Sequence, residues 1–457
     1  MLDWKKLLSN RILGEDTPPR SLAMDGRDQF QRDFDRIAFC SAFRRLQDKT
    51  QVFPLPENDF VHTRLTHSLE VSCIGRSLGN LIGKQILEKH KELKTEFTNF
   101  HFGEIVAAAC LAHDIGNPPF GHSGEDAIAE YFRKGSGQRY QLELNNEKYW
   151  NDLVRFEGNA QGFRIITKLQ NPHLQGGLRL TFATLGAFTK YPKESGLPDE
   201  SANKNVKGKL YKKFGFFQSE KESFKEVAKE TGLIKKKIKG IDWWSRHPLT
   251  YLVEAADDIC YRIMDLEDGF RLGLLTFAET EELLKPFIKE KSLKGYSERN
   301  NNEKVGYLRA KSISETVQQL SEVFVAEEEN ILSDNFDSTL ISEIDSGKAL
   351  ETIKEISVEK IYSYQSVVER EAAGYEVLGG LLDIFISAVN EAAEGKISFR
   401  NDSLLKLVPG QFLHTKGKSP DDLYKRLLKI TDFVSGMTDS YAVSLFRKLK
   451  GISLPGR

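Results

Sequence analysis

The sequence predicts an all-α protein, because apolar residues recur at helical spacing along most of its 457 residues and strand-like alternation is scarce. The segment 104–113 (EIVAAACLAH) is rich in alanine and apolar on successive turns, which indicates a buried helix. Apolar stripes at 65–87 and 248–266 indicate two further helices. The only extended or hairpin segment that we expect is a short one at 51–53.

The first of these helices is followed by a strong break. Residues 116–119 read Gly-Asn-Pro-Pro, and proline neither continues a helix nor allows helical backbone in the residue before it. We expect a new helix to begin near Ser123, which is suited to act as its N-cap, and to run through Phe132.

The chain divides into a core and two helical regions. We expect a core in 1–270, with a polar, lysine-rich excursion of loops and short helices at about 190–242. Residues 271–365 form a charged helical region with few chemical signals. Residues 366–457 return to buried helix patterns and complete the core. This organisation predicts a helical bundle with long helical insertions and a helical C-terminal region.

Composition indicates a soluble globular protein, with 40% hydrophobic and 29% charged residues. The net charge of -1 excludes a bulk positive field for nucleic acid. The four cysteines form no C-x-x-C pair, so we expect reduced core cysteines. The N-terminus is too short and polar for a signal segment, and no run of about 18 apolar residues predicts a membrane span. We therefore predict a cytoplasmic protein that has no membrane partner.

Four widely spaced residues form a candidate metal site: His67, His113, Asp114 and Asp257. Two imidazoles and two carboxylates suit a divalent cation such as Mn, Mg, Fe, Co or Ni, with one ion per site. The absence of a thiolate from this set argues against structural zinc. Four ligands leave positions open for water and a phosphate oxygen, as a catalytic metal requires.

Asp257 belongs to a polar stripe on an otherwise apolar helix. Asp257, Tyr261 and Asp265 are spaced four residues apart and therefore share one face. A carboxylate in so apolar a helix is costly unless it is paired or bound to metal. The neighbouring Asp258 is an alternative ligand, although the stripe favours Asp257. The remaining histidines that we considered are expected to be ordinary core or surface residues: His90, His101, His173 and His414.

His122 and Glu125 follow the metal-binding candidates closely. An imidazole and a carboxylate beside a metal suit proton transfer and the positioning of water. Together with the metal set, they predict a metal-dependent nucleotide hydrolase.

The order of these residues resembles the HD-domain phosphohydrolase superfamily, and the phrases around them resemble the deoxynucleoside triphosphate triphosphohydrolases, the dGTPase-like proteins. The resemblance covers most of 20–270 and part of 366–448. The phrases that carry it are FDRIAFCSAFRRLQDKTQVFP (34–54), TRLTHSLEV (63–71), LAHDIGNPPFGHSGE (111–125), RFEGNAQGFRI (155–165), LTFATLGAFTKYP (180–192), KFGFFQSE (213–220), RHPLTYLVEAADDICYRIMDLED (246–268) and SGMTDSYA (435–442).

This resemblance implies a reaction in which a dNTP and water give a deoxynucleoside and intact triphosphate, by attack at the α-phosphorus. It implies that His67, His113, Asp114 and Asp257 hold the metal. It places His122 near the scissile phosphate, with Glu125 orienting it.

The same resemblance implies the substrate contacts. Arg64 would bind a phosphate oxygen. Gln51, Tyr261 and Asp265 would line the sugar and leave no space for a 2′-hydroxyl. Asn159 would line the same pocket without an assigned role. Family members are also regulated by nucleotides or DNA and form homo-oligomers, often hexamers, so the resemblance implies the same for this chain.

Several alternatives stay open at this point. His122 could donate a proton to the leaving oxygen or act as a nucleophile. The base preference could be dGTP alone or all dNTPs. Further phosphate-binding candidates are Arg36, Arg44, Arg45, Arg155 and Lys190. The lysines of the excursion form either a solvated loop or a surface for a nucleotide effector or single-stranded DNA. Alternative functions are another HD-type phosphomonoesterase or phosphodiesterase, and a nucleotide- or DNA-binding regulator.

Overall fold

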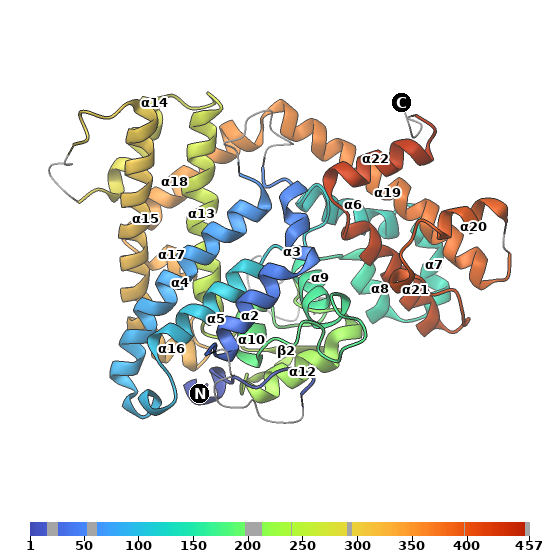
Figure 1. Cartoon of the computed structure of the whole chain (residues 1–457), viewed down its shortest axis with the longest axis horizontal. Helices are drawn as coiled ribbons and strands as arrows, with labels where there is room; N and C mark the ends of the chain where they lie inside the picture. The colour runs from blue at the N-terminus through green and yellow to red at the C-terminus, as the bar shows by residue number, and fades with distance from the viewer. Residues whose placement is uncertain are drawn as a thin grey trace.

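The computed structural model confirms the all-α prediction (Figure 1). It describes residues 1–15, 26–52, 62–196, 213–238, 240–289, 295–396 and 398–452. Phe53, at the end of the expected extended segment, lies outside this part of the chain. Five lysines of the lysine-rich excursion also lie outside it, namely Lys204, Lys207, Lys209, Lys212 and Lys239.

Three helices that contact one another form the centre of the molecule (Figure 1). They are α4 (Arg64–Lys89), α5 (Asn99–Ala112) and α13 (Thr250–Arg271). Helix α5 is buried from Ile105 to Ala112, which explains its alanine-rich, all-round apolar sequence. It is covered by α2 (Gln29–Phe39) and α10 (Phe182–Phe188).

The helix expected near Ser123 is present, but the prediction of Ser123 as its N-cap was wrong. Helix α6 (His122–Arg133) begins one residue earlier, and its N-cap is Gly121. Phe120 and Gly121 have φ values of 65° and 62°, in the left-handed region. The chain needs this conformation to turn from the two prolines into the helix, and glycine supplies it without strain.

The region 271–365 packs against one side of this centre. Helices α15 (Asn301–Ala326) and α18 (Gly347–Ser357) contact α13, and α15 also contacts α4 (Figure 1). Their apolar residues join the same hydrophobic cluster as α4, α5 and α13. The charged sequence of this region therefore belongs to helices with one buried face.

A second hydrophobic cluster lies at the opposite end of the molecule (Figure 1). It is formed by α6, α7 (Tyr140–Leu144) and α8 (Glu147–Val154) together with the C-terminal α19 (Gln365–Ala393), α21 (Pro420–Ser435) and α22 (Asp439–Leu449). Phe385 and Phe433 pack edge to face within it. The last hundred residues of the chain thus cover the helix that begins with His122.

Helix α19 differs from the expectation that no segment is long and apolar enough to span a membrane. Within the described residues it is the one helix long and apolar enough, with a mean hydropathy of 1.5 over its most apolar window. Half of that window is buried inside the protein, against α6, α21 and α22. This burial is what a core helix requires.

The lysine-rich excursion contains a hairpin that the sequence did not predict. Strands β1 (Lys235–Ile238) and β2 (Ile241–Trp244) pair antiparallel around a turn with Gly240 at φ 80°. The run of lysines in β1 obscures the alternation of apolar and polar residues that is typical of a strand. The sequence signal for this hairpin is therefore limited to the buried tryptophans of β2. The short helix α12 (Lys221–Glu230) agrees with the expectation for this stretch.

The remaining elements are short. The α-helices are α1 (Trp4–Leu7), α3 (Ser41–Arg45), α9 (Gly158–Arg164), α14 (Phe277–Leu284), α16 (Glu328–Leu332), α17 (Leu340–Glu343) and α20 (Phe399–Leu405). Single 3₁₀ turns are η1 (Leu46–Asp48), η2 (Lys91–Thr95), η3 (Ser136–Arg139), η6 (Gln218–Glu220), η7 (Lys285–Phe287) and η9 (Gly410–Phe412), and π turns are η4 (Ile165–Leu169) and η8 (Val358–Tyr362).

A buried ionic cluster joins α9 to the C-terminal region. Arg164 donates to both carboxylate oxygens of Asp432 on α21, at 2.7 to 3.0 Å, and also donates to Glu220. All three side chains are at most 4% exposed. A guanidinium so deeply buried is tolerated only because two carboxylates surround it.

We predict that Asp432→Ala lowers the free energy of unfolding by about 3–5 kcal/mol, because it leaves a buried charge undercompensated. Urea denaturation followed by circular dichroism measures this change. Asp402→Ala is the matched control, since Asp402 pairs with Lys406 at an exposed position, and it should cost less than about 1 kcal/mol. Equal losses in the two variants would contradict the role assigned to the buried cluster.

Candidate active site

Three of the candidate metal ligands converge from the three central helices. His67 lies in the first turn of α4, His113 follows the last residue of α5, and Asp257 lies on α13. One ligand atom of each lies within 4.8 Å of the others. Asp257 Oδ1 is 3.3 Å from His67 Nε2 and 3.5 Å from His113 Nε2. These distances leave room for an ion between them.

The orientation of His113 suits metal binding. Its Nδ1 lies 2.7 Å from the carbonyl oxygen of Cys110, which can only accept, so Nδ1 carries the proton. Nε2 of the neutral ring is then a free electron-pair donor facing Asp257. Burial opposes ionisation of Asp257, but its interaction with His113, its hydrogen bond with His67 and the charge of Lys190 hold its pKa well below the usual range. The carboxylate is therefore ionised, as a ligand must be.

Asp114 lies next to this group but is engaged by other donors. Its Oδ2 accepts a hydrogen bond of 2.6 Å from Arg64, and its Oδ1 accepts one of 2.7 Å from Asn117. Oδ1 is also 3.4 Å from His113 Nε2. Asp258, the alternative to Asp257, instead faces Arg262 at 3.8 Å and is 37% exposed.

His122 and Glu125 form a hydrogen-bonded pair at the start of α6. His122 Nδ1 is 2.8 Å from Glu125 Oε2, and Glu125 Oε1 accepts a 2.6 Å bond from the backbone of Gly158. The imidazole is 76% exposed, whereas the carboxylate is 11% exposed. The hydrogen bond and charge of Glu125 raise the pKa of His122. An exposed imidazole is thus held by a fixed carboxylate, which favours the protonated form of the ring.

Arg64 connects this pair with the metal candidates. It is buried in the first turn of α4, one turn before His67, and pairs with Asp114. A Cβ added at Gly121 would lie only 2.6 Å from Arg64 Nη2, so a side chain there would displace the guanidinium. The residue just before His122 is therefore in contact with the arginine beside the metal candidates.

The polar stripe of α13 continues away from Asp257 into an aromatic and acidic group. Tyr261 stacks on Tyr362 with ring centroids 5.4 Å apart, and the Tyr362 hydroxyl donates to Asp265 at 2.7 Å. Burial raises the pKa of Asp265 to about 8. Sequence reasoning missed Tyr362, because it lies in the charged region 271–365 and no motif marks it.

Gln51 and Asn159 have different surroundings. The side-chain oxygen of Gln51 is buried and has no hydrogen-bond partner within the described part of the chain, which leaves it available to a ligand. The Asn159 amide donates to Glu157 Oε1 at 2.6 Å. Its position on α9 places it one residue from Gly158, which holds Glu125.

Two lysines also lie beside the site. Lys190 Nζ is 3.6 Å from Asp257 Oδ2 and 3.9 Å from Glu254, and Lys213 Nζ is 3.3 Å from Glu157. The charge of Glu125 helps to raise the pKa of Lys213, against the effect of burial. Two of the candidate arginines bind protein groups instead: Arg36 donates to Asp33 and Arg44 to the carbonyl of Phe39.

The C-terminal phrase 435–442 anchors two loops of the site. Asp439 is 4% exposed and accepts hydrogen bonds from the backbone and hydroxyl of Thr50 and from the backbone of Phe120. The buried Lys49 donates to the carbonyls of Asn117 and Ser435. The residues before Gln51 and before His122 are thus held by the end of the chain.

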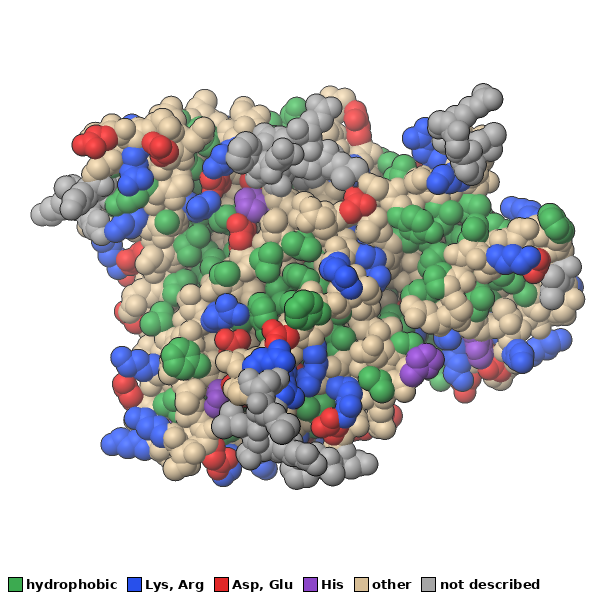
Figure 2. Space-filling model, viewed as in Figure 1, with side chains coloured by type: hydrophobic (Ala, Val, Ile, Leu, Met, Phe, Trp, Pro, Cys, Tyr) green, Lys and Arg blue, Asp and Glu red, His purple; other side chains and the backbone are tan. Residues whose placement is uncertain are grey.

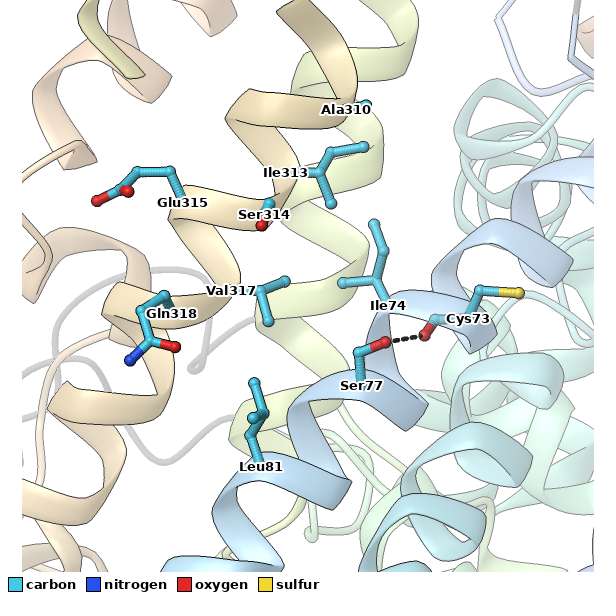
Figure 3. A pocket seen from close by; sticks show the side chains of 10 residues that line it. All are labelled: Cys73, Ile74, Ser77, Leu81, Ala310, Ile313, Ser314, Glu315, Val317 and Gln318. Atoms are coloured by element: carbon cyan, nitrogen blue, oxygen red, sulfur yellow. Dashed lines mark hydrogen bonds between the residues drawn. The ribbon is translucent and has the colours of Figure 1, made fainter. Parts of the chain in front are cut away.

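A separate cavity of about 570 Å³ lies between α4 and α15 (Figure 3). None of the candidate site residues lines it. Its lining includes Ile74, Leu81 and Ile313, with Ser77 and Glu315 among the polar groups. Cys73, which the sequence placed in the core, is exposed here. The cavity is therefore distinct from the metal candidates.

Comparison with known proteins agrees with this geometry. The family model for the HD domain matches residues 64–181, and the model for the phosphohydrolase-associated domain matches residues 343–448. The all-α fold is thus that of an HD-domain protein.

Relatives narrow the family. A deoxyguanosinetriphosphate triphosphohydrolase-like protein of Synechocystis is 45% identical over 99% of this chain and 100% of its own length. A protein of the same name from Pseudomonas aeruginosa is 39% identical with the same coverage. A deoxyguanosinetriphosphate triphosphohydrolase of Yersinia enterocolitica is 31% identical over 92% of this chain and 93% of its own. The chain belongs to the family of deoxyguanosinetriphosphate triphosphohydrolase-like proteins.

We predict that Asp257→Ala abolishes tight binding of Mn²⁺, because it removes the carboxylate that both imidazoles face. Isothermal titration of the purified chain, stripped of metal beforehand, measures the affinity. Asp258→Ala is the matched control and should bind Mn²⁺ like the unchanged protein. Loss of binding in the Asp258 variant alone would transfer the ligand role to Asp258.

Proposed function

We propose that this protein hydrolyses deoxynucleoside triphosphates to deoxynucleosides and inorganic triphosphate, by attack at the α-phosphorus. The observation that carries the proposal is the convergence of His67, His113 and Asp257 beside the His122–Glu125 pair. The names of the relatives support the substrate class and the reaction. The intact triphosphate product distinguishes this reaction from that of other HD-type esterases.

The donor set fits a divalent cation held by His67, His113 and Asp257, with Asp114 as fourth ligand. Two imidazoles and carboxylate oxygens suit Mn, Mg, Fe, Co or Ni. When bound, such an ion would supply Lewis acidity at a phosphate oxygen. Asp114 would also hold Arg64, whose planar guanidinium can bind phosphate oxygens bidentately.

His122 acts in this proposal as the proton donor to the departing 5′-oxygen. Its hydrogen bond to Glu125 favours the protonated ring, and its exposure makes it accessible to substrate. A nucleophilic His122 would require the neutral ring, which Glu125 disfavours. Lys190 and Lys213 would bind the triphosphate, whose negative charge needs several cations.

Tyr261, Asp265 and Gln51 would contact the deoxyribose, and Asn159 would line the same pocket. Tyr362 would hold the Asp265 carboxyl in place and pack behind Tyr261. Because Asp265 is buried and its pKa is about 8, it can present a protonated or an ionised oxygen to a sugar hydroxyl near neutral pH. A closely packed wall here would exclude a 2′-hydroxyl.

We also propose a cytoplasmic homo-oligomer, for which a hexamer is one candidate form, regulated by a nucleotide effector or single-stranded DNA. Basic and acidic side chains are intermixed on the face shown in Figure 2. Lys235 forms an ion pair with Asp242, and Lys236 forms one with Asp334. This pairing favours a solvated surface, and not a DNA-binding surface, for these two lysines. Salt-dependent binding of an oligonucleotide would support a DNA surface.

We predict that the Mn²⁺-supplied protein releases intact triphosphate from dNTPs, because the site binds the α-phosphate and not the terminal one. Anion-exchange analysis of incubations with each dNTP singly, and with all four mixed, identifies the products. Faster turnover in the mixture would indicate an activating nucleotide. Pyrophosphate or single phosphate as the first product would contradict the proposed reaction.

A second prediction concerns the acid. His122→Ala should lower kcat by at least about 100-fold, the usual contribution of an acid–base residue, without changing the metal content.

Glu125→Gln should lower the pKa of His122, because the hydrogen-bonded charge is lost. The protonated ring then persists only to a lower pH, so the alkaline limb of the kcat profile moves to lower pH. A shift of the acid limb instead would indicate a nucleophilic His122.

A further inference from the structure

Lys190 lies between two carboxylates on successive turns of α13. Its Nζ atom is 3.9 Å from Glu254 Oε1 and 3.6 Å from Asp257 Oδ2. Both distances are longer than a direct hydrogen bond, so the two charges attract the ammonium without fixing it to either carboxylate. Lysine also has a long, flexible side chain. The position of Lys190 therefore depends on the balance between Glu254 and Asp257.

This position matters for metal binding because Asp257 is one of the candidate ligands. Asp257 Oδ1 faces the two imidazoles, at 3.3 Å from His67 Nε2 and 3.5 Å from His113 Nε2, whereas Oδ2 faces Lys190. An ammonium that moved closer to Asp257 would repel a divalent cation at the same carboxylate. A shorter contact between Lys190 and Asp257 would therefore compete with metal binding.

Glu254 is held in place from its other side. Arg246 Nη2 forms an ion pair with Glu254 Oε2, so the two oxygens of this carboxylate face different cations. The Arg246 guanidinium lies over the ring of Tyr251, 4.1 Å from its centroid, and the arginine side chain is only 10% exposed. Glu254 is thus a fixed negative charge one turn before Asp257 on α13.

We propose that Glu254 is a positioning residue, which draws Lys190 away from Asp257 and so leaves this carboxylate to the metal ion. Lys190 stays beside the site, where the proposed function places the triphosphate. The inference rests on the metal site of that proposed function. It adds a residue that controls metal affinity through a neighbouring lysine and does not itself contact the ion.

The test is a double-mutant cycle on Mn²⁺ affinity, measured by isothermal titration of the full-length protein stripped of metal. Glu254→Gln keeps the shape of the side chain and removes its charge, so Lys190 should move towards Asp257 and Mn²⁺ should bind about threefold or more weakly. Lys190→Met removes the competing ammonium and should not weaken Mn²⁺ binding. In the Lys190→Met background, Glu254→Gln should change the affinity by less than about twofold, because the lysine through which it acts is gone.

Glu230→Gln is the matched control. Glu230 also forms an ion pair with an arginine, Arg11, and it is not among the candidate site residues. Its loss should leave Mn²⁺ affinity unchanged. A loss equal to that of Glu254→Gln would overturn the inference, because removal of any such pair would then have the same effect.

An equal loss of affinity from Glu254→Gln with and without Lys190 would also overturn the inference, since Glu254 would then act through its own charge or through the fold. Unchanged affinity in Glu254→Gln, or weaker Mn²⁺ binding in Lys190→Met, would do the same. If circular dichroism shows that Glu254→Gln is not folded, Glu254→Asp takes its place in the cycle. It keeps the charge but withdraws it from Lys190, so a smaller loss with the same dependence on Lys190 is expected.

Failure of the proposed function has a separate signature. No Mn²⁺ binding by the unchanged protein would remove the metal site and this inference with it. Mn²⁺ binding without release of triphosphate from any dNTP would contradict the proposed reaction alone, because the titration contains no nucleotide.

Discussion

The close approach of α4 and α5 is the constraint on which the site depends. A Cβ at Gly79 would lie 2.7 Å from the carbonyl oxygen of Phe102 and 2.8 Å from the Cα of Gly103, so only glycine allows the helices to come this near. The centroids of the His67 and His113 rings are consequently 5.3 Å apart. A wider spacing would leave Asp257 facing one imidazole at most. The proximity of the candidate metal ligands thus follows from the packing of the two backbones. Their polar groups then compensate one another within the site.

Local sequence features predicted much of this arrangement. The alanine-rich periodicity identified α5, and the spacing of Asp257, Tyr261 and Asp265 placed these three side chains on one face of α13. The choice between Asp257 and Asp258 also followed from helical geometry, because the two side chains point about 100° apart around the helix axis. The structure places Asp257 with the imidazoles and Asp258 opposite Arg262. Helical periodicity decides which face a residue occupies, so such predictions need no knowledge of the rest of the fold.

Contacts between distant segments could not be predicted in the same way. Tyr362 lies 97 residues from Asp265, and Asp439 lies 389 residues from Thr50. Nothing near either residue in the sequence marks its partner. The hairpin at 235–244 is another such case, because its Trp244 packs against Phe216 and Phe224, which lie outside the hairpin itself. Ser123 was misassigned because a favourable capping residue was present one position inside the helix that Gly121 begins. Tertiary packing determined these features, and the local sequence does not predict which distant residues pack together.

The anchoring of Thr50 and Phe120 by Asp439 has a consequence for the order of assembly during synthesis. All the candidate metal ligands, the His122–Glu125 pair and the proposed sugar contacts of α13 are translated before α19 to α22. A nascent chain would hence carry every reactive group while the loops that present two of them still lack their buried acceptor. The ribosome must release the last helix before Asp439 can bind these loops. The geometry of the candidate site therefore depends on helices near the C-terminus, so that a chain terminated before Asp439 would keep the chemical groups of the site without the contacts that position its loops.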